Sequence, residues 1–151
     1  MANKIDIEQI KRLREETGVA IIRIREVLKE VKDDEKKALA ILKKEGLEKA
    51  ERREGRETSQ GKIFVYAHHT GQVVGIVELL CETDFVAKNE LFEKLGKDLA
   101  MQAASMGEEK FEDQDFVKDG SHKVKDLVKE LIAKTGENVK LGRVQRLELG
   151  K

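Results

Sequence analysis

Apolar residues recur every three or four positions through the first fifty residues, in three runs separated by polar or glycine-containing stops. The runs consist of Ile7, Ile10 and Leu13; of Ile21, Ile24, Val27, Leu28 and Val31; and of Ala38, Leu39 and Leu42. This spacing predicts three amphipathic helices. We expect the first to end at Thr17-Gly18 and the third to begin at the cap Asp33-Asp34 and end at Gly46. Because none of them can bury a face alone, they favour a three-helix bundle over residues 1–50.

The period changes after a charged segment at residues 51–61. That segment has no apolar residue and contains two glycines, so we interpret it as a linker that is helical at its start. Residues 62–68 then alternate, with Ile63, Val65 and Ala67 between Lys62, Phe64, Tyr66 and His68. A turn at residues 70–72 leads into an apolar run at residues 73–81, and the whole predicts a β-hairpin. The second strand is apolar on both faces, so it is expected to be central or covered by a helix.

Two amphipathic helices and a last strand complete the pattern. A connector at residues 83–89 precedes a helix lined by Leu91, Phe92, Leu95, Leu99, Ala103 and Met106. Residues 107–122 are mixed and acidic, and we expect a loop with room for one helical turn. A further helix carries Val124, Leu127, Val128, Leu131 and Ile132 and ends at Thr135-Gly136. The strand at residues 139–149 has an expected irregularity at Gly142-Arg143.

The predicted fold class is α+β. Residues 62–151 are expected to form a core domain of order β-β-α-α-β, with a three-stranded antiparallel sheet covered by helices. No internal repeat is visible in the chain.

The balance of charge in the composition favours a protein partner over a nucleic acid or a membrane. Of the 151 residues, 40% are charged, yet thirty basic residues balance thirty acidic ones. A nucleic-acid or membrane binder would carry a basic excess. The single cysteine, together with an N-terminus that lacks the apolar core of a signal peptide, favours a protein of the cytosol.

Candidate catalytic residues are few. His68 and His69 are adjacent on a predicted strand, so their side chains are expected on opposite faces, unable to share one metal ion. Cys81 lies in an apolar strand and is interpreted as a small buried hydrophobe. His122 has no visible partner in its loop. No phosphate-binding glycine motif occurs, so we expect no nucleotide binding, no metal, no cofactor and no enzymatic chemistry.

Three basic residues near the end, Lys140, Arg143 and Arg146, suggest a minority interpretation as an RNA contact. Neighbouring acidic residues and the zero net charge argue against it. The charged helix faces are interpreted as solvated surface.

The connector at residues 83–87, Thr83-Asp84-Phe85-Val86-Ala87, is the least ordinary segment. An aromatic residue beside a carboxylate at the exit of a buried strand has the form of an interface anchor. Periodicity alone still favours Phe85 folding back under the following helix.

A resemblance to a known family changes that preference. The ten residues from Cys81 to Glu90, CETDFVAKNE, resemble the signature of the elongation factor Ts family. Further similarity lies in order along nearly the whole chain, at Leu13-Arg14-Glu15, Thr17-Gly18, Glu45-Gly46, Tyr66, His68, Gly71 and Val73, and in residues 98–102, 116–119 and 132–138.

The resemblance implies a nucleotide exchange factor that promotes GDP release from elongation factor Tu. It implies that the N-terminal helices form a ubiquitin-associated-type bundle that docks on the G domain of that partner. It further implies that Thr83, Asp84, Phe85 and Val86 enter between helices of the G domain and disturb its magnesium site. Additional contacts are expected at Leu13, Arg14, Thr17, Gly18 and His68.

Three departures from the family pattern are visible. Residues 19–28 differ from the usual second helix, the stretch between Met106 and Phe116 is short, and Gln145 stands where some short members carry a cysteine that supports a dimer. A homodimer is therefore not assumed. The alternative function is a plain interaction module, in which the bundle binds a helical or ubiquitin-like protein and the rest is scaffold.

Overall fold

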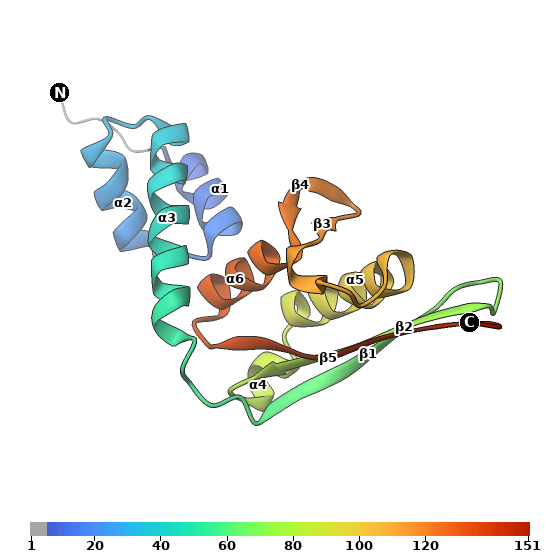
Figure 1. The fold of residues 1–151 in the computed structure, drawn as a ribbon. Coiled ribbons are helices and arrows are strands. Elements are labelled where there is room, and N and C mark those ends of the chain that lie inside the picture. The colour runs from blue at the N-terminus through green and yellow to red at the C-terminus, as the bar shows by residue number, and fades with distance from the viewer. Residues whose placement is uncertain (1–5) are drawn as a thin grey trace.

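The computed structural model describes residues 6–151, so the first five residues of the expected 1–50 module lie outside the described part (Figure 1). In chain order the elements are α1 (Ile7–Thr17), α2 (Ile21–Glu30), α3 (Glu35–Arg53), β1 (Gln60–Ala67), β2 (Val73–Cys81), α4 (Asp84–Ala87), α5 (Glu90–Met106), the 3₁₀ turn η1 (Phe111–Asp113), β3 (Asp115–Phe116), β4 (Asp119–Lys123), α6 (Val124–Thr135) and β5 (Val139–Glu148). The predicted α+β class is confirmed.

The three N-terminal helices pack around a core of their own. The Asp6 side chain accepts a hydrogen bond from the Glu8 amide and starts α1, and Gly18 ends it with a φ of 68°. The buried side chains of this core are Ile10, Leu13, Ile24, Val27, Leu28, Ala38 and Leu42. All belong to the predicted apolar runs, so the bundle is confirmed as three packed helices. Its likeness to a ubiquitin-associated domain stays a prediction.

The expected end of the third helix at Gly46 is wrong, because α3 continues to Arg53. Gly46 is buried, and a Cβ atom added there would lie 3.1 Å from the Cβ atom of Ala133 in α6. The glycine therefore permits a close approach between two helices and does not terminate one. Figure 1 shows α3 running from the bundle down past the end of α6, so this one helix belongs to both parts of the molecule.

The expected three-stranded antiparallel sheet is confirmed, with strand order β1-β2-β5 and β2 at its centre. At one end of the sheet Cys81 pairs with Gln60 on one side and with Val139 on the other. The register between β2 and β5 shifts between Val77 and Leu79. The shift leaves Glu78 opposite two residues, Gly142 and Arg143, where the irregularity was expected.

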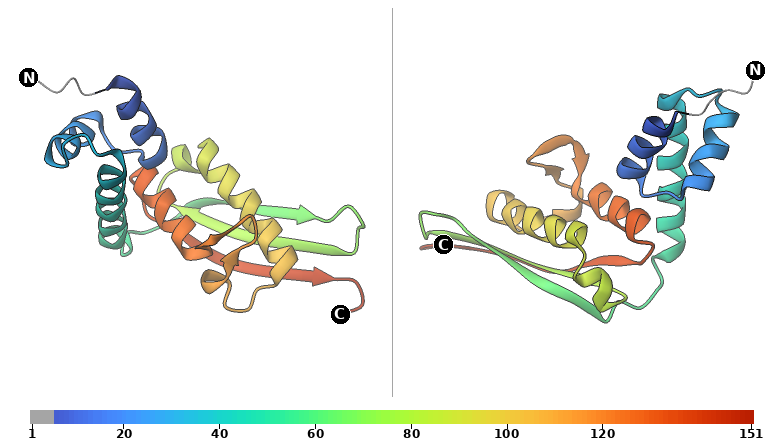
Figure 2. Two further views of the ribbon diagram at one scale, coloured as in Figure 1. Left: turned by 90° about the horizontal axis from the view of Figure 1, so that it is seen from above. Right: turned by 180° about the vertical axis from the view of Figure 1, so that it is seen from behind.

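Helices α5 and α6 cover one face of the sheet, as Figure 2 shows from two sides. Phe64 of β1 is buried on this face, 5.9 Å from Phe92 of α5 between ring centroids. Ile63 and Val65, which alternate with it, are exposed. The aromatic side chains of β1 therefore lie on the helix-covered face of the sheet.

Two segments hold more structure than expected. Residues 107–122 contain the predicted turn, η1, but also the short antiparallel pair of β3 and β4. This pair is fixed from a distance by Gln102 of α5, whose amide donates to the carbonyl of Asp115 and accepts from the Val117 amide. The connector at residues 83–89 contains the short helix α4. Within residues 6–151 no helix is long and apolar enough to cross a membrane.

Candidate functional site

The segment Thr83-Asp84-Phe85-Val86 lies where the central strand β2 leaves the sheet, and its last three residues belong to α4. Thr83 starts this helix, because its hydroxyl accepts a hydrogen bond of 3.4 Å from the Val86 amide. Four residues are too few to form a stable helix alone. The orientation of α4 therefore depends on what holds it against the core.

One side of α4 is buried in the core, and the other side is exposed to solvent. Val86 and Ala87 belong to the hydrophobic core between the sheet and helices α5 and α6. Phe85 is 83% exposed, the largest exposed fraction among the exposed large apolar residues of the described chain. The expectation that Phe85 folds back under the next helix is thus wrong, and its role as an interface anchor stays a prediction. Asp84 is also exposed, and its carboxylate pairs with Lys88 at 3.4 Å.

A second set of contacts reaches the segment from the turn between α6 and β5. Glu137 accepts hydrogen bonds from both the amide and the hydroxyl of Thr83, at 2.9 and 2.6 Å. In return, Glu82 accepts one of 2.7 Å from the Asn138 amide. The Asn138 side chain, which is buried, donates to the carbonyls of Glu54 and Arg56 at 3.2 and 2.8 Å. The end of α3, the start of α4 and the start of β5 are therefore tied together at one point.

Cys81 lies directly before this segment and is buried. Its thiol donates a hydrogen bond to the carbonyl of Thr83 at 3.1 Å. Burial, and then the negative charge of Glu137, raise the pKa of the thiol. The interpretation of Cys81 as a small buried hydrophobe is confirmed, since a reactive cysteine would need the opposite shift.

The expected contacts in α1 divide into buried and exposed residues. Leu13 and Thr17 are buried, and the Thr17 hydroxyl donates to the Leu13 carbonyl at 2.6 Å. Arg14 and Gly18 are exposed. A Cβ atom added to Gly18 would lie 3.0 Å from the Cα atom of Lys134 in α6. In this conformation Leu13 and Thr17 support the bundle from within, and the contact role of all four residues stays a prediction.

His68 lies at the opposite end of the sheet, in the turn after β1, so the length of the strands separates it from α4, roughly 25 Å. The expectation that His68 and His69 point to opposite faces is wrong. The strand ends at Ala67, and the two rings approach to 4.2 Å between centroids. The His68 ring also makes a hydrogen bond of 2.8 Å with the Thr70 hydroxyl. No group of three metal-binding side chains occurs among residues 6–151.

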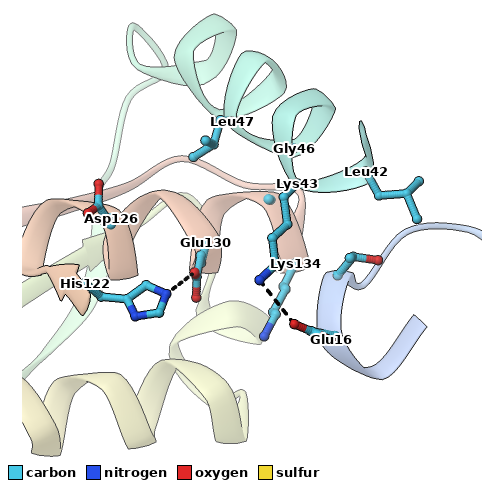
Figure 3. A pocket seen from close by; sticks show the side chains of 11 residues that line it. Glu16, Leu42, Lys43, Gly46, Leu47, His122, Asp126, Glu130 and Lys134 are labelled. Carbon is cyan, nitrogen blue, oxygen red and sulfur yellow. Dashed lines mark ion pairs between the residues drawn. The ribbon is translucent and has the colours of Figure 1, made fainter. Parts of the chain in front are cut away.

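The interpretation of His122 as a residue without a partner is wrong. Its ring nitrogens lie 3.1 Å from a carboxylate oxygen of Asp119 and 3.4 Å from one of Glu130 in α6. Figure 3 shows it at one end of a cavity of about 380 Å³ between the bundle and α6. At the other end Lys43 pairs with Glu16 at 3.1 Å. The lining of this cavity contains both lysines and carboxylates beside the apolar side chains of Leu42 and Leu47.

The basic residues near the C-terminus do not form a free cationic patch. Arg143 pairs with Glu78 at 3.0 Å, and Arg146 pairs with Glu148 at 2.6 Å. Lys140 is exposed on β5. Pairing with carboxylates leaves little net charge for a phosphate backbone, so the RNA interpretation gains nothing from the structure.

The roles of Glu137 and Asn138 were missed in the sequence, although one signal could have found them. Antiparallel pairing of β2 with β5 places the residue after the end of one strand beside the residue before the start of the other. The observed register, in which Cys81 pairs with Val139, brings Glu82 and Thr83 next to Glu137 and Asn138, so a prediction of this pairing would have found the contact.

The chain is similar to known proteins over almost its whole length. The sequence model of a family described as Elongation factor TS matches residues 82–151. The Elongation factor Ts of Leptospira biflexa serovar Patoc is 35% identical over 194 aligned positions, which cover 97% of this chain and 98% of the relative. That of Thermotoga maritima is 34% identical over 193 positions, covering 97% of each. That of Herpetosiphon aurantiacus is 35% identical over 194 positions, covering 97% and 98%.

These alignments are longer than the chain itself. With 194 positions against 151 residues, at least 43 positions of the alignment to the Leptospira biflexa protein have no residue here. The expected shortness relative to the family is thus confirmed, while its location between Met106 and Phe116 stays a prediction. With identities of about 35% over nearly the full length of both chains, the chain belongs to the elongation factor Ts family.

Proposed function

We propose that this chain is a nucleotide exchange factor of bacterial translation that accelerates GDP release from elongation factor Tu in the cytosol. In this proposal Phe85 is the group that enters the G domain of the partner, with Asp84 beside it. The observation that carries the proposal is the exposure of Phe85, 83%, on a helix whose other side is anchored in the core. Membership of the elongation factor Ts family supports the choice of partner.

The physical basis of exchange is differential binding. The factor must bind the nucleotide-free partner more tightly than the GDP-bound one, and GDP then weakens binding of the factor by the same ratio. Disturbance of the magnesium site and phosphate loop of elongation factor Tu would produce this difference in affinity, because GDP is held by those two sites. The factor needs no nucleotide site, cofactor or covalent step of its own.

The exposed ring is large enough to account for a substantial part of this ratio. Full burial of a phenylalanine side chain contributes about 2 kcal/mol, a factor of about 30 in an equilibrium constant. This 30-fold contribution favours exchange only if the ring is buried in the nucleotide-free complex and not in the GDP-bound one. Truncation of Phe85 should therefore slow release at saturating factor, and not merely weaken docking.

The test is release of a fluorescent GDP analogue from elongation factor Tu, followed by stopped flow over a range of factor concentrations. The wild-type chain should accelerate release, and Phe85→Ala should lose most of that acceleration at saturation. Val117→Ala is the matched control, because Val117 is an exposed apolar residue, 45% accessible, in the turn between β3 and β4. It should behave as the wild type.

The alternative function, a plain interaction module built on the N-terminal bundle, makes a different prediction. In that case the wild-type chain leaves the spontaneous rate of GDP release unchanged, whatever it binds. A wild-type effect that Phe85→Ala retains in full would keep the exchange function but remove Phe85 from its centre.

A further inference from the structure

We propose that Glu137 is the positioning residue that holds α4 in the orientation required for exchange, an inference that rests on the proposed function. Glu137 lies 52 positions after Phe85 in the chain and belongs to the turn between α6 and β5. It does not contact the partner in this proposal. It acts through Thr83, the residue that begins the helix carrying Phe85.

The geometry of the contact is that of a clamp. Both carboxylate oxygens of Glu137 are used, one by the Thr83 amide at 2.9 Å and the other by the Thr83 hydroxyl at 2.6 Å. The same hydroxyl accepts from the Val86 amide at 3.4 Å, so the clamp extends into the first turn of α4. Hydrogen bonds to an ionised carboxylate are shorter and stronger than those between neutral groups.

Its partners distinguish Glu137 from an ordinary surface carboxylate. Among residues 6–151 it forms no ion pair within 4.0 Å, and the hydrogen bonds that it accepts come from Thr83 alone. Its backbone amide donates a hydrogen bond of 3.4 Å to the hydroxyl of Thr135, the last residue of α6. The side chain therefore serves the start of α4 and not the neutralisation of a nearby cation.

The helix needs such a clamp because burial alone fixes only part of it. The last two residues of α4, Val86 and Ala87, are buried in the core, while the first two, Asp84 and Phe85, are exposed to solvent. Without the clamp the N-terminal end of a four-residue helix can fray, and the exposed ring would then sample many orientations. If the start of α4 is disordered in the free protein, the free-energy cost of ordering it must be met when Phe85 enters the partner, and this weakens binding.

The first experiment measures GDP release from elongation factor Tu at saturating factor. Glu137→Ala should lower the maximal acceleration about tenfold, the equivalent of about 1.4 kcal/mol, because it removes both charge-assisted hydrogen bonds. Thr83→Val, which removes only the hydroxyl, should lie between this variant and the wild type.

A double variant distinguishes a positioning role of Glu137 from a general loss of stability. In a Phe85→Ala background, Glu137→Ala should have no further effect on the remaining acceleration, because there is no ring left to orient. A tenfold loss in that background as well would overturn the proposal. So would a maximal rate of Glu137→Ala equal to that of the wild type.

A readout without the partner tests positioning independently of the proposed function. Amide hydrogen exchange at Thr83 and Val86 should become about tenfold faster in Glu137→Ala, while the amides of α5 keep their protection. Unchanged exchange at Thr83 would overturn the positioning role even if the chain accelerates GDP release. Faster exchange at Thr83 in a chain that leaves GDP release unchanged would retain the clamp and reject the exchange function.

Discussion

The ring of Phe64 in β1 lies directly on the backbone of Gly96 in α5, and a Cβ atom added to that glycine would overlap the ring. Both residues are buried. The sheet and the helix can approach this closely only because position 96 has no side chain. A glycine in the middle of a helix costs about 1 kcal/mol relative to alanine, so close packing offsets a local preference here.

Replacement of Gly96 by alanine should therefore destabilise the fold despite the higher helix propensity of alanine. We expect a loss of about 2 kcal/mol in the free energy of unfolding, from overpacking against Phe64. Urea denaturation followed by circular dichroism measures it. Phe64→Leu in the same chain should recover part of the loss.

Gly55→Ala is the control for Gly96→Ala, since a Cβ atom at position 55 would meet nothing within 4 Å. Its unfolding free energy should stay within about 0.5 kcal/mol of the wild type. A stabilised Gly96→Ala variant would show that the ring can move aside at no cost.

Asn138 should be needed to hold the segment between α3 and β1. Asn138→Asp keeps the shape of the side chain but removes the amide that donates to Glu54 and Arg56, and it introduces a buried charge. We expect a loss of about 2 kcal/mol and faster tryptic cleavage at Arg56. Urea denaturation and limited proteolysis measure the two effects.

Asn89→Asp supplies the matched change at an exposed helix cap, where aspartate serves as well as asparagine. It should leave both stability and cleavage unchanged. Equal effects from the two substitutions would contradict a special role for the Asn138 amide.

The helices and the main sheet could be predicted because the spacing of apolar residues reports the type of element, although in β1 the buried residue is Phe64 and not the alternating Ile63 and Val65. The end of α3 could not, because a glycine in a helical pattern marks either a stop or a close approach. Only the presence of Ala133 beside Gly46 decides between them. The pair of β3 and β4 was missed for a related reason, since its polar residues have no period and are held by Gln102 from α5.

The residues of the candidate site come from the sequence and stay a prediction, whereas their geometry could not be predicted at all. Periodicity alone favoured burial of Phe85 and was wrong, because Val86 and Ala87 fill the core in its place. The clamp by Glu137 required the register between β2 and β5. Position along the chain gives no sign of a contact between residues 54 apart.

Cys81 should be slow to react with thiol reagents in the folded protein. Its burial raises the thiol pKa, so the reactive thiolate is scarce at neutral pH, and the surrounding core blocks access. We expect labelling to be at least about 100-fold slower than in urea, because it requires opening of the structure. The measurement is the rate of reaction with a chromogenic disulfide at pH 7.5. Labelling as fast in buffer as in urea would contradict the buried position.

Acid should weaken the N-terminal bundle through the ion pair of Arg23 and Glu45. The guanidinium of Arg23 in α2 donates two hydrogen bonds, of 3.1 and 2.5 Å, to the Glu45 carboxylate in α3 and lowers the pKa of that carboxyl. The folded state therefore holds the charged form more strongly than the unfolded chain does. This contribution is present above the ordinary glutamate pKa of about 4.3 and is lost as the pH falls through the lower value of the folded state.

Glu45→Gln should consequently lower the urea midpoint at pH 7 and have a smaller effect at pH 3, because the stabilisation from the charged carboxylate declines as the pH falls below the ordinary glutamate pKa. Both residues are partly exposed, with side chains 33% and 28% accessible, so the effect at pH 7 should be modest and should shrink in 1 M salt. Glu48→Gln is the control on the same helix, since the structure shows no ion pair for that exposed carboxylate among residues 6–151. An effect of Glu45→Gln that is equally large at both pH values would assign its role to packing, because a contribution from the carboxylate charge must decrease as the pH falls.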